Sequence, residues 1–351
     1  MKNQQLIKTA YKSVKDCLSD ISFINSINSD ASFNESKPDY IFHVETLLGR
    51  KKLYVEIKDN GQPRYARALV EKLSLFNETP ENYWIFVAPF VSEKTGQLLR
   101  ESGIGFVDFA GNCYISFEGV HIQKEGKKNP FLTKRKFKSL FKLKASRILR
   151  VLLSDPNRPW KIEQLAKEAQ VSTGHVYNIK EELLDREWAH FDNKGLKLDE
   201  PESLLQEWCN EYQAEEKPCT NFYSLLAPSE LETRIKMSCN DLKVRYALSG
   251  LAGAFRLAPF VRYHRVTFYL EDKIDELAKI MDLKSVTSGE NVTVITPLDD
   301  GVFYNLDRIG EMPVVSPIQL YLDLNMLGDR GKEAAEFIFK QVIEPRWKKR
   351  K

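Results

Sequence analysis

Polar and apolar residues in the stretch 160–198 follow the spacing of two short helices and then of two short strands. Apolar residues recur at helical intervals in two neighbouring groups, which are Leu165, Ala166 and Ala169 and then Val176, Ile179 and Leu183. Ser172 lies between the groups, where a serine side chain caps the free N–H groups of a helix's first turn. The second helix is therefore predicted from Thr173 to about Arg186.

Two strands are predicted after this helix, at 188–191 and 196–198, around the sequence Asp192-Asn193-Lys194-Gly195. Asparagine and glycine tolerate positive φ and are typical of tight hairpin turns. Two helices joined by a turn and followed by a hairpin form a winged helix-turn-helix, whose second helix enters the major groove of DNA. The pattern therefore predicts a DNA-binding domain, and a domain of this shape used only for protein contact is the alternative.

The outward positions of the second helix are the candidate DNA contacts. We expect contacts to base edges or phosphates from Ser172, Thr173, His175, Tyr177, Asn178 and Lys180, and from Lys194 at the tip of the hairpin. Gln170 occupies the turn position that most often holds glycine. A left-handed backbone at a residue with a side chain costs about 1 kcal/mol. Either Gln170 carries that cost or the turn is less tight.

A basic run from Lys124 to Arg150 leads into the first helix of this domain. It contains eleven Lys or Arg residues and a single acid, Glu125. Such a run beside a DNA-reading helix favours a phosphate-binding surface, although solvated linkers share the composition. The residues expected to contact phosphate are Lys134, Arg135, Lys136 and Lys138. We expect DNA affinity to fall steeply with added salt.

The first 123 residues have the pattern of a mixed α/β sheet. An amphipathic helix is predicted at 4–19, strands at 38–46, 51–58, 83–88 and 104–109, and helices at 63–76 and 92–101. Asp108 and Asn112, near the last of these strands, fit a polar site or a capped turn, and the turn is favoured because Gly111 frees the backbone.

Three polar residues in this part carry candidate chemistry. Alternation places Glu56 and Lys58 on one face of a strand, and Asp39 begins the neighbouring strand. Asp39 and Glu56 can hold Mg²⁺, and the lysine can stabilise charge on an attacked phosphate. The arrangement resembles the PD-(D/E)xK core of the restriction-endonuclease-like fold, in which Asp39, Glu56 and Lys58 would be catalytic if the domain is an active nuclease. The alternative is a solvent-facing ion pair that contributes under about 1 kcal/mol.

The remainder of the chain predicts an α+β domain. Strands are expected at 243–248, 266–270 and 292–297, and helices at 272–282, 316–326 and 330–343. The whole chain is thus predicted as an α/β plus α+β multidomain protein. Its parts would be a restriction-endonuclease-like domain at 1–123, a basic linker at 124–144, a winged helix-turn-helix at 145–200, a linker helix at 201–222 and the α+β domain at 223–351.

Composition agrees with a cytoplasmic nucleic-acid-binding protein. The chain has 351 residues and a net charge of only +3, so its basicity is local. No apolar stretch is long enough for a membrane span, and the first residues lack the apolar core of a signal peptide. Five cysteines without a CxxC spacing argue against a disulfide framework or a structural zinc site.

Two further stretches carry a resemblance to a known family. APFVSEKTGQLLRESGIGFVDFAGNCYISF at 88–117 and VSPIQLYLDLNMLGDRGKEAAEFI at 315–338 resemble bacterial proteins grouped with the AbiEi-type antitoxins of type IV toxin-antitoxin, or abortive-infection, systems. The resemblance implies a regulator that binds the promoter of its own operon in phage defence. It also implies a nucleotidyltransferase-like toxin encoded nearby, without obligatory direct contact. Well-known members begin with the winged helix, whereas here an endonuclease-like domain precedes it.

Three functions compete on these observations. A sequence-specific DNA-binding repressor accounts for the helix-turn-helix, the basic run and the resemblance, and it needs double-stranded DNA but no cofactor. A Mg²⁺-dependent nuclease targeted by the winged helix also uses Asp39, Glu56 and Lys58. A scaffold that holds a toxin through the third domain leaves the DNA features unused. We favour the repressor, and a homodimer suits it because one winged helix reads a short half-site.

Overall fold

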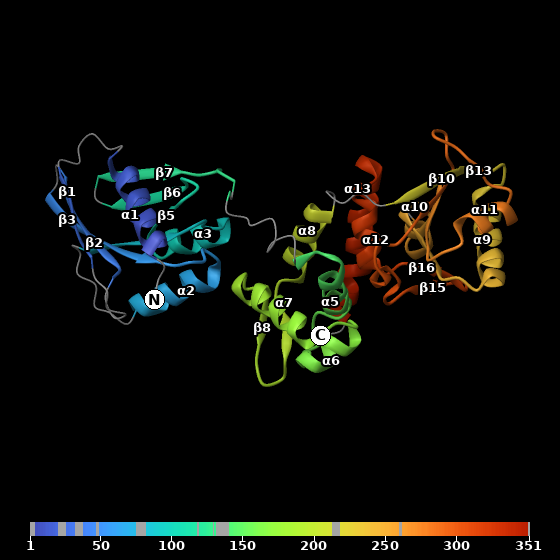
Figure 1. The fold of residues 1–351 in the computed structure, drawn as a ribbon, viewed down its shortest axis with the longest axis horizontal. Helices are drawn as coiled ribbons and strands as arrows, with labels where there is room; N and C mark the ends of the chain where they lie inside the picture. Colours follow the sequence, from blue (N-terminus) through green and yellow to red (C-terminus); the bar gives the residue numbers. More distant parts are fainter. Residues whose placement is uncertain are drawn as a thin grey trace. The chain divides into compact units, whose positions relative to one another are not determined.

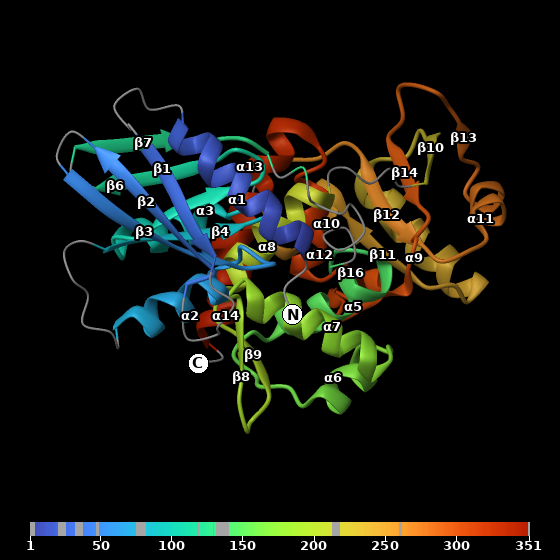
Figure 2. The ribbon, with the colours of Figure 1, turned by 60° about the vertical axis from the view of Figure 1, so that its left-hand side comes forward.

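The computed structural model describes residues 4–19, 26–31, 38–46, 49–74, 82–117, 119–128, 130, 140–212, 218–259 and 262–349. The chain forms two compact units, the first from residues before 137 and the second from most of the residues after it (Figures 1 and 2). Both combine helices with a seven-stranded sheet, so the chain has the mixed α/β, multi-unit architecture that the sequence predicts. No described helix is both long enough and apolar enough to cross a membrane.

The first unit is built on one sheet whose strands lie side by side in chain order. Its elements are α1 Gln4–Ser19, β1 Ser26–Ala31, β2 Tyr40–Thr46, β3 Gly49–Ile57, α2 Pro63–Ser74, β4 Asn82–Ala88, α3 Glu93–Glu101, β5 Gly105–Asp108, β6 Cys113–Phe117 and β7 Val120–Lys124. β3, β4 and β5 run parallel and the other neighbours are antiparallel. The predicted helices and strands of this part are confirmed, and β1, β6 and β7 are additional.

Both faces of this sheet are covered. β4 shows why, because its residues alternate between two cores: Ile85 and Val87 pack with α1, whereas Phe86 and Ala88 pack with α2 and α3. A strand buried on both faces has a continuous apolar run instead of an alternating one. Within the α1 core, the thiol of Cys17 on α1 donates to the thiol of Cys113 on β6 at 3.0 Å, and this hydrogen bond lowers the pKa of Cys113.

Asp108 and Asn112 form a closed turn. Asp108 is buried, and its carboxylate accepts the backbone N–H and the side-chain amide of Asn112, each at 2.8 Å. The Asn112 side chain in turn exchanges hydrogen bonds with the backbone of Lys127. Gly111 has a φ of +93°, which a residue with a side chain rarely adopts. The turn interpretation of this sequence is confirmed.

The second unit begins with three helices and a hairpin, here called the α5–β9 segment (Figure 2). Its elements are α5 Leu143–Ser154, α6 Ile162–Glu168, α7 Thr173–Asp185, β8 Ala189–Phe191 and β9 Leu196–Leu198. α7 begins where predicted, and Ser172 Oγ accepts the N–H of His175 at 3.3 Å. Gln170 has a φ of 54°, so the turn before α7 is left-handed despite the side chain.

Gly195 secures the hairpin against the rest of the segment. The backbone of Leu196 exchanges two hydrogen bonds of 2.8 Å with Trp160, which precedes α6. A Cβ atom at position 195 would lie 2.4 Å from the carbonyl oxygen of Trp160, and the φ there is +131°. Only glycine satisfies both conditions, so the hairpin is held to α6 through a residue without a side chain.

The remaining elements form a second sheet with helices on both faces. They are α8 Pro201–Tyr212, β10 Cys219–Tyr223, α9 Pro228–Leu242, β11 Tyr246–Ser249, α10 Gly250–Leu257, β12 Val266–Leu270, α11 Ile274–Ile280, β13 Lys284–Ser285, β14 Val292–Ile295, the 3₁₀ helix η1 Asp300–Phe303, β15 Asp307–Ile309, β16 Met312–Val314, α12 Pro317–Leu324, α13 Gly328–Ile338, the π-helix η2 Phe339–Ile343 and α14 Glu344–Lys349. The strand order is β13-β10-β14-β12-β11-β16-β15. The predicted strands and helices are present, whereas β10, α9, α10, β13, β15, β16 and α14 were not predicted.

One hydrophobic core joins the α5–β9 segment to the helices that follow it. Ile148 and Val176 of the segment, Trp208 of α8, Leu320 of α12 and Ile338 of α13 belong to the same buried cluster. In Figure 1, α12 and α13 lie between the α5–β9 segment and the second sheet. The segment is therefore packed against the remainder of the second unit along a shared interior.

The left-handed turn at Gln170 can be tested by substitution. We expect Gln170→Gly to raise the free energy of unfolding by about 1 kcal/mol relative to Gln170→Ala, because glycine adopts positive φ without steric cost. The alanine variant is the matched control, since both changes remove the 3.4 Å contact from Arg147 to the Gln170 side chain. Urea denaturation of the full chain measures the difference. Equal stability of the two variants would contradict a left-handed turn.

Candidate nucleic-acid interface

α7 presents one apolar face to the interior and one polar face to solvent. Val176, Ile179 and Leu183 are buried against the core of the α5–β9 segment. The predicted contact residues Ser172, Thr173, Tyr177 and Asn178 are exposed. Their side chains are short or of medium length and carry hydrogen-bonding groups, as readers of base edges do.

His175 lies between these two faces. It is half-buried, and its Nε2 atom is shielded from solvent without a hydrogen-bond partner among the described residues. An unpaired buried ring nitrogen is uncommon, because each one costs free energy on folding. His175 therefore carries an unused donor or acceptor at the edge of the polar face.

Lys180 does not have the outward position that the sequence analysis gave it. Its side chain is only 10% exposed, and its ammonium group lies 2.8 Å from Glu181. The same group lies 4.7 Å from the ring centre of Tyr177 and 4.8 Å from that of Phe191. Lys180 thus packs between α7 and β8, where a cation is stabilised by the faces of two aromatic rings.

The hairpin tip carries the remaining predicted contact of this segment. Lys194 is exposed, and its backbone N–H donates to Asp192 at 2.8 Å. That hydrogen bond lowers the pKa of the Asp192 carboxyl group. Lys161 reaches from the start of α6 to the carbonyl oxygen of Asn193. Two lysines therefore lie at the tip, and the side chain of Lys194 extends from a turn held by its own backbone contacts.

The basic run from Lys124 to Arg150 contains three kinds of residue. One kind is described and exposed, namely Lys124, Lys127, Lys128, Lys142 and Lys144. Lys134, Arg135, Lys136 and Lys138 lie outside the described residues. Arg147 and Arg150, at the end of the run, face the interior of the second unit. Arg147 forms a bidentate ion pair with Asp299, with Nε 2.7 Å from one carboxylate oxygen. The interpretation of the whole run as a phosphate-binding surface is wrong for these two arginines, because their guanidinium groups are engaged inside the protein.

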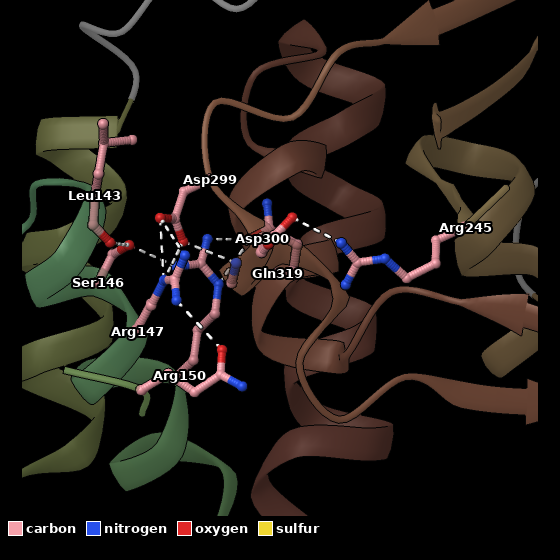
Figure 3. A network of polar contacts seen from close by, with 10 residues as sticks. Leu143, Ser146, Arg147, Arg150, Arg245, Asp299, Asp300 and Gln319 are labelled. Carbon is pink, nitrogen blue, oxygen red and sulfur yellow. Dashed lines mark hydrogen bonds and ion pairs between the residues drawn. The ribbon is translucent and has the colours of Figure 1, made fainter. Parts of the chain in front are cut away.

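Arg150 begins a buried polar network that the sequence analysis did not anticipate (Figure 3). Its guanidinium donates to Gln319 Oε1 from Nε and Nη2, at 3.2 and 2.5 Å, and to Ser146 from Nη1 at 2.7 Å. Its carbon atom lies 5.0 Å from the centre of the Trp208 ring. Gln319 then donates to Asp323 at 2.9 Å. The network connects α5 to α12 through hydrogen bonds alone.

Asp323 is the acceptor on which this network converges. Besides Gln319, its carboxylate accepts the hydroxyls of Tyr212 and Tyr269 at 2.9 Å and of Ser249 at 2.6 Å. Burial and the negative charge of Asp323 raise the pKa of Tyr269 well above its usual value, which keeps the hydroxyl a donor. One signal of this site was in the sequence: Gln319 and Asp323 are four residues apart, and so share one face of the otherwise apolar helix PIQLYLDL.

In the first unit, the three candidate nuclease residues lie at the junction of β2 and β3. The Asp39 carboxylate accepts the backbone N–H of Ile57 at 2.7 Å, which places it beside the neighbour of Glu56 in the chain. Glu56 is buried, and its two oxygens lie 2.8 Å from the ammonium of Lys58 and 3.4 Å from that of Lys72. Lys72, on α2, is a partner that the sequence analysis missed.

A magnesium ion at Glu56 would have to displace an ammonium group. Both oxygens of Glu56 are already neutralised by ammonium groups, and a divalent cation beside two lysines would meet strong repulsion. Among the residues that the structure describes, no group of three or more His, Cys, Asp or Glu side chains could hold a metal ion. The arrangement satisfies a buried carboxylate with two cations, and it accounts for Glu56 and Lys58 without a bound metal.

Comparison with known proteins gives one match. Residues 197–344 match the model of a protein family described as transcriptional regulator, AbiEi antitoxin, type IV TA system. No curated protein and no solved structure matches the chain. The matched range runs from β9 to α14 and contains the stretch 315–338, whereas α5, α6, α7 and the first unit lie outside it. This part of the chain is thus similar to transcriptional regulators of type IV toxin-antitoxin systems.

The buried network predicts a large effect of removing Asp323. We expect Asp323→Ala to lower the free energy of unfolding of the second unit by about 3 kcal/mol, because four buried donors lose their acceptor. Glu311→Ala is the control, since Glu311 is 82% exposed and its ion pair with Lys236 lies at the surface; its effect should be much smaller than that of Asp323→Ala. Denaturant titration measures both. Similar losses in the two variants would show that the network contributes little.

Proposed function

We propose that the chain is a DNA-binding transcriptional regulator in which the α5–β9 segment is a winged helix-turn-helix. The observation that carries the proposal is the shape of α7, a helix held by a buried apolar face with its polar face open to solvent. The hairpin after it carries an exposed lysine, Lys194, at its tip. Helices with this support enter the major groove of DNA, and hairpins of this kind lie along the adjacent backbone.

Roles follow from the positions of the side chains. Thr173, Tyr177 and Asn178 would face the bases from the exposed side of α7. Ser172 caps the helix and would present its hydroxyl to a phosphate, as Lys194 would from the hairpin. We assign Lys134, Arg135, Lys136 and Lys138 to phosphate contacts by charge alone. The half-buried His175 would offer its unpaired nitrogen at the rim of the contact surface.

Lys180 takes a different role in this proposal. Because its ammonium packs on the rings of Tyr177 and Phe191, it would fix the angle between α7 and β8 without touching bases. In this proposal, Lys180 holds the exposed face of α7 in position. The same packing would hold the ring of Tyr177, whose outer face is half exposed, in one place.

We further propose that the regulator represses its own toxin-antitoxin operon. The family match at residues 197–344 supports this, since it describes antitoxin regulators of type IV systems. In such a system, the partners would be double-stranded operator DNA and a nucleotidyltransferase-like toxin encoded nearby. The site of action would be the cytoplasm, and a homodimer would read two half-sites.

For the first unit we propose a restriction-endonuclease-like fold without nuclease activity. The element order of helix, three strands, helix and strand supports the fold, as does the place of Asp39, Glu56 and Lys58 at adjoining strands. The two ammonium groups on Glu56 support a role in architecture or binding instead of Mg²⁺-dependent cleavage. Fold alone does not imply catalysis.

The DNA-binding proposal is tested by Asn178→Ala. We expect this variant to bind a fragment of the gene's own upstream region about 5- to 150-fold more weakly, because a lost contact to a base edge costs roughly 1–3 kcal/mol. Mobility shifts over a salt series measure the affinity, which should fall steeply as salt is added.

The control for that experiment is Thr233→Ala, which removes an exposed hydroxyl from α9 in the same unit. Its affinity should equal that of the unchanged protein. Equal affinity of Asn178→Ala and Thr233→Ala would show that α7 is not the reading helix. Absence of any preference for the upstream fragment over unrelated DNA would remove the repressor proposal itself.

The proposal for the first unit predicts that Mg²⁺ leaves DNA intact. Incubation of supercoiled and linear DNA with the protein and Mg²⁺ should give no strand breaks, because Glu56 is already paired with Lys58 and Lys72. Gel electrophoresis reads the outcome, and Glu56→Gln serves as the control for contaminating nucleases. Cleavage by the unchanged protein that is lost in Glu56→Gln would establish the nuclease alternative.

A further inference from the structure

A cavity opens beside the buried guanidinium of Arg150. It lies among α5, α8, β12 and the stretch 296–302. The cavity volume is about 40 Å³, within about 440 Å³ of empty space that includes open solvent. A buried water needs roughly 10–15 Å³ of such enclosed volume, so a group of about three non-hydrogen atoms fits the inner part.

Arg150 reaches this cavity with part of its hydrogen-bonding capacity unused. A guanidinium has five N–H groups, and Arg150 donates three of them, to Gln319 and Ser146. One N–H on each terminal nitrogen is left without an acceptor among the described residues. Two N–H groups on neighbouring nitrogens match the two oxygens of a carboxylate.

The charge of Arg150 is also left without a direct counter-ion. Its residue is 4% exposed, and burial lowers the pKa of the guanidinium. Asp299 lies nearby but is engaged by Arg147 through three hydrogen bonds. Asp323 is separated from Arg150 by the side chain of Gln319. A buried cation without an ion pair is costly, so an anion that entered the cavity would be bound favourably.

The outer walls of the cavity are apolar. Leu143 at the start of α5 and Leu298 before η1 both line it, and these residues are 45% and 48% exposed. Phe141 and Val302 complete this part of the lining. A ligand whose charged end pairs with Arg150 would therefore place its other end on exposed hydrocarbon, which is stabilised by burial.

We propose that this cavity binds small carboxylic acids that carry an apolar tail. The carboxylate pairs with the two unused N–H groups of Arg150, and the tail covers Leu143 and Leu298. The site selects such a carboxylate over phosphate, because the apolar walls at Leu143 and Leu298 stabilise a hydrocarbon tail and offer phosphate no hydrogen-bond partner. This ligand site is independent of DNA binding, although the ligand would touch α5, the first helix of the α5–β9 segment.

Calorimetric titration of the full chain tests the proposal, with benzoate, isobutyrate and inorganic phosphate as the three probes. We expect saturable binding of benzoate and isobutyrate, with phosphate binding much more weakly. Arg150→Gln should weaken benzoate binding at least about 10-fold, because a charge-assisted pair contributes roughly 1.5–3 kcal/mol. DNA is absent from the titration, so its result does not depend on the proposed regulator function.

A second variant keeps the test decisive if Arg150→Gln does not fold. Leu143→Trp fills the mouth of the cavity from an exposed position, and it should weaken benzoate binding by a similar factor. Leu225→Trp is the matched control, because Leu225 is 90% exposed and does not line the cavity. The proposal is overturned if neither carboxylate shows saturable binding up to about 10 mM, where the binding free energy is only a few kcal/mol. Tighter binding of phosphate than of benzoate, or benzoate binding unaffected by Leu143→Trp, also overturns it.

Discussion

The carboxylate of Asp323 is the point on which the second unit depends. It accepts hydrogen bonds from α8, from β11, from β12 and from its own helix, so four elements are aligned by one buried charge. Gln319 extends that alignment to Arg150 and hence to α5. A network of buried hydrogen bonds favours one arrangement over others of similar apolar burial. The orientation of the α5–β9 segment therefore follows from contacts made far from its exposed face.

The interior position of several cations changes how the charge of this chain is understood. Arg147, Arg150 and Lys180 were counted among basic or outward residues, yet each is held by an acid, an amide oxygen or an aromatic ring. Charges held in this way are shielded from a passing phosphate. In the proposed regulator, long-range attraction to DNA would come instead from lysines that extend into solvent, such as Lys194, whose interactions are screened within a distance of about 10 Å by salt.

Much of the fold could be predicted from sequence because its signals are local. Features that depend on long-range contacts could not be predicted. Ser172 and Gly195 act on their own turns, so the start of α7 and the hairpin lie where they were expected. The burial of Lys180 depends on Phe191 in another element, and that of Arg150 depends on Gln319, 169 positions away. No periodicity reveals such partners. Strands as short as β15 and β16 were missed because three residues carry too little pattern.

The contact between Trp347 and Leu153 joins residues that are synthesised far apart in time. The indole N–H of Trp347 donates to the carbonyl oxygen of Leu153 at 2.7 Å, across 194 positions of sequence. Ribosomes add about 5–20 residues per second, so roughly 10–40 s separate the synthesis of the two residues. During that time the carbonyl oxygen of Leu153 lacks this partner, although α5 can already pack with α6 and β9. The segment proposed to read DNA is thus synthesised well before α14, which supplies one of the last contacts to α5.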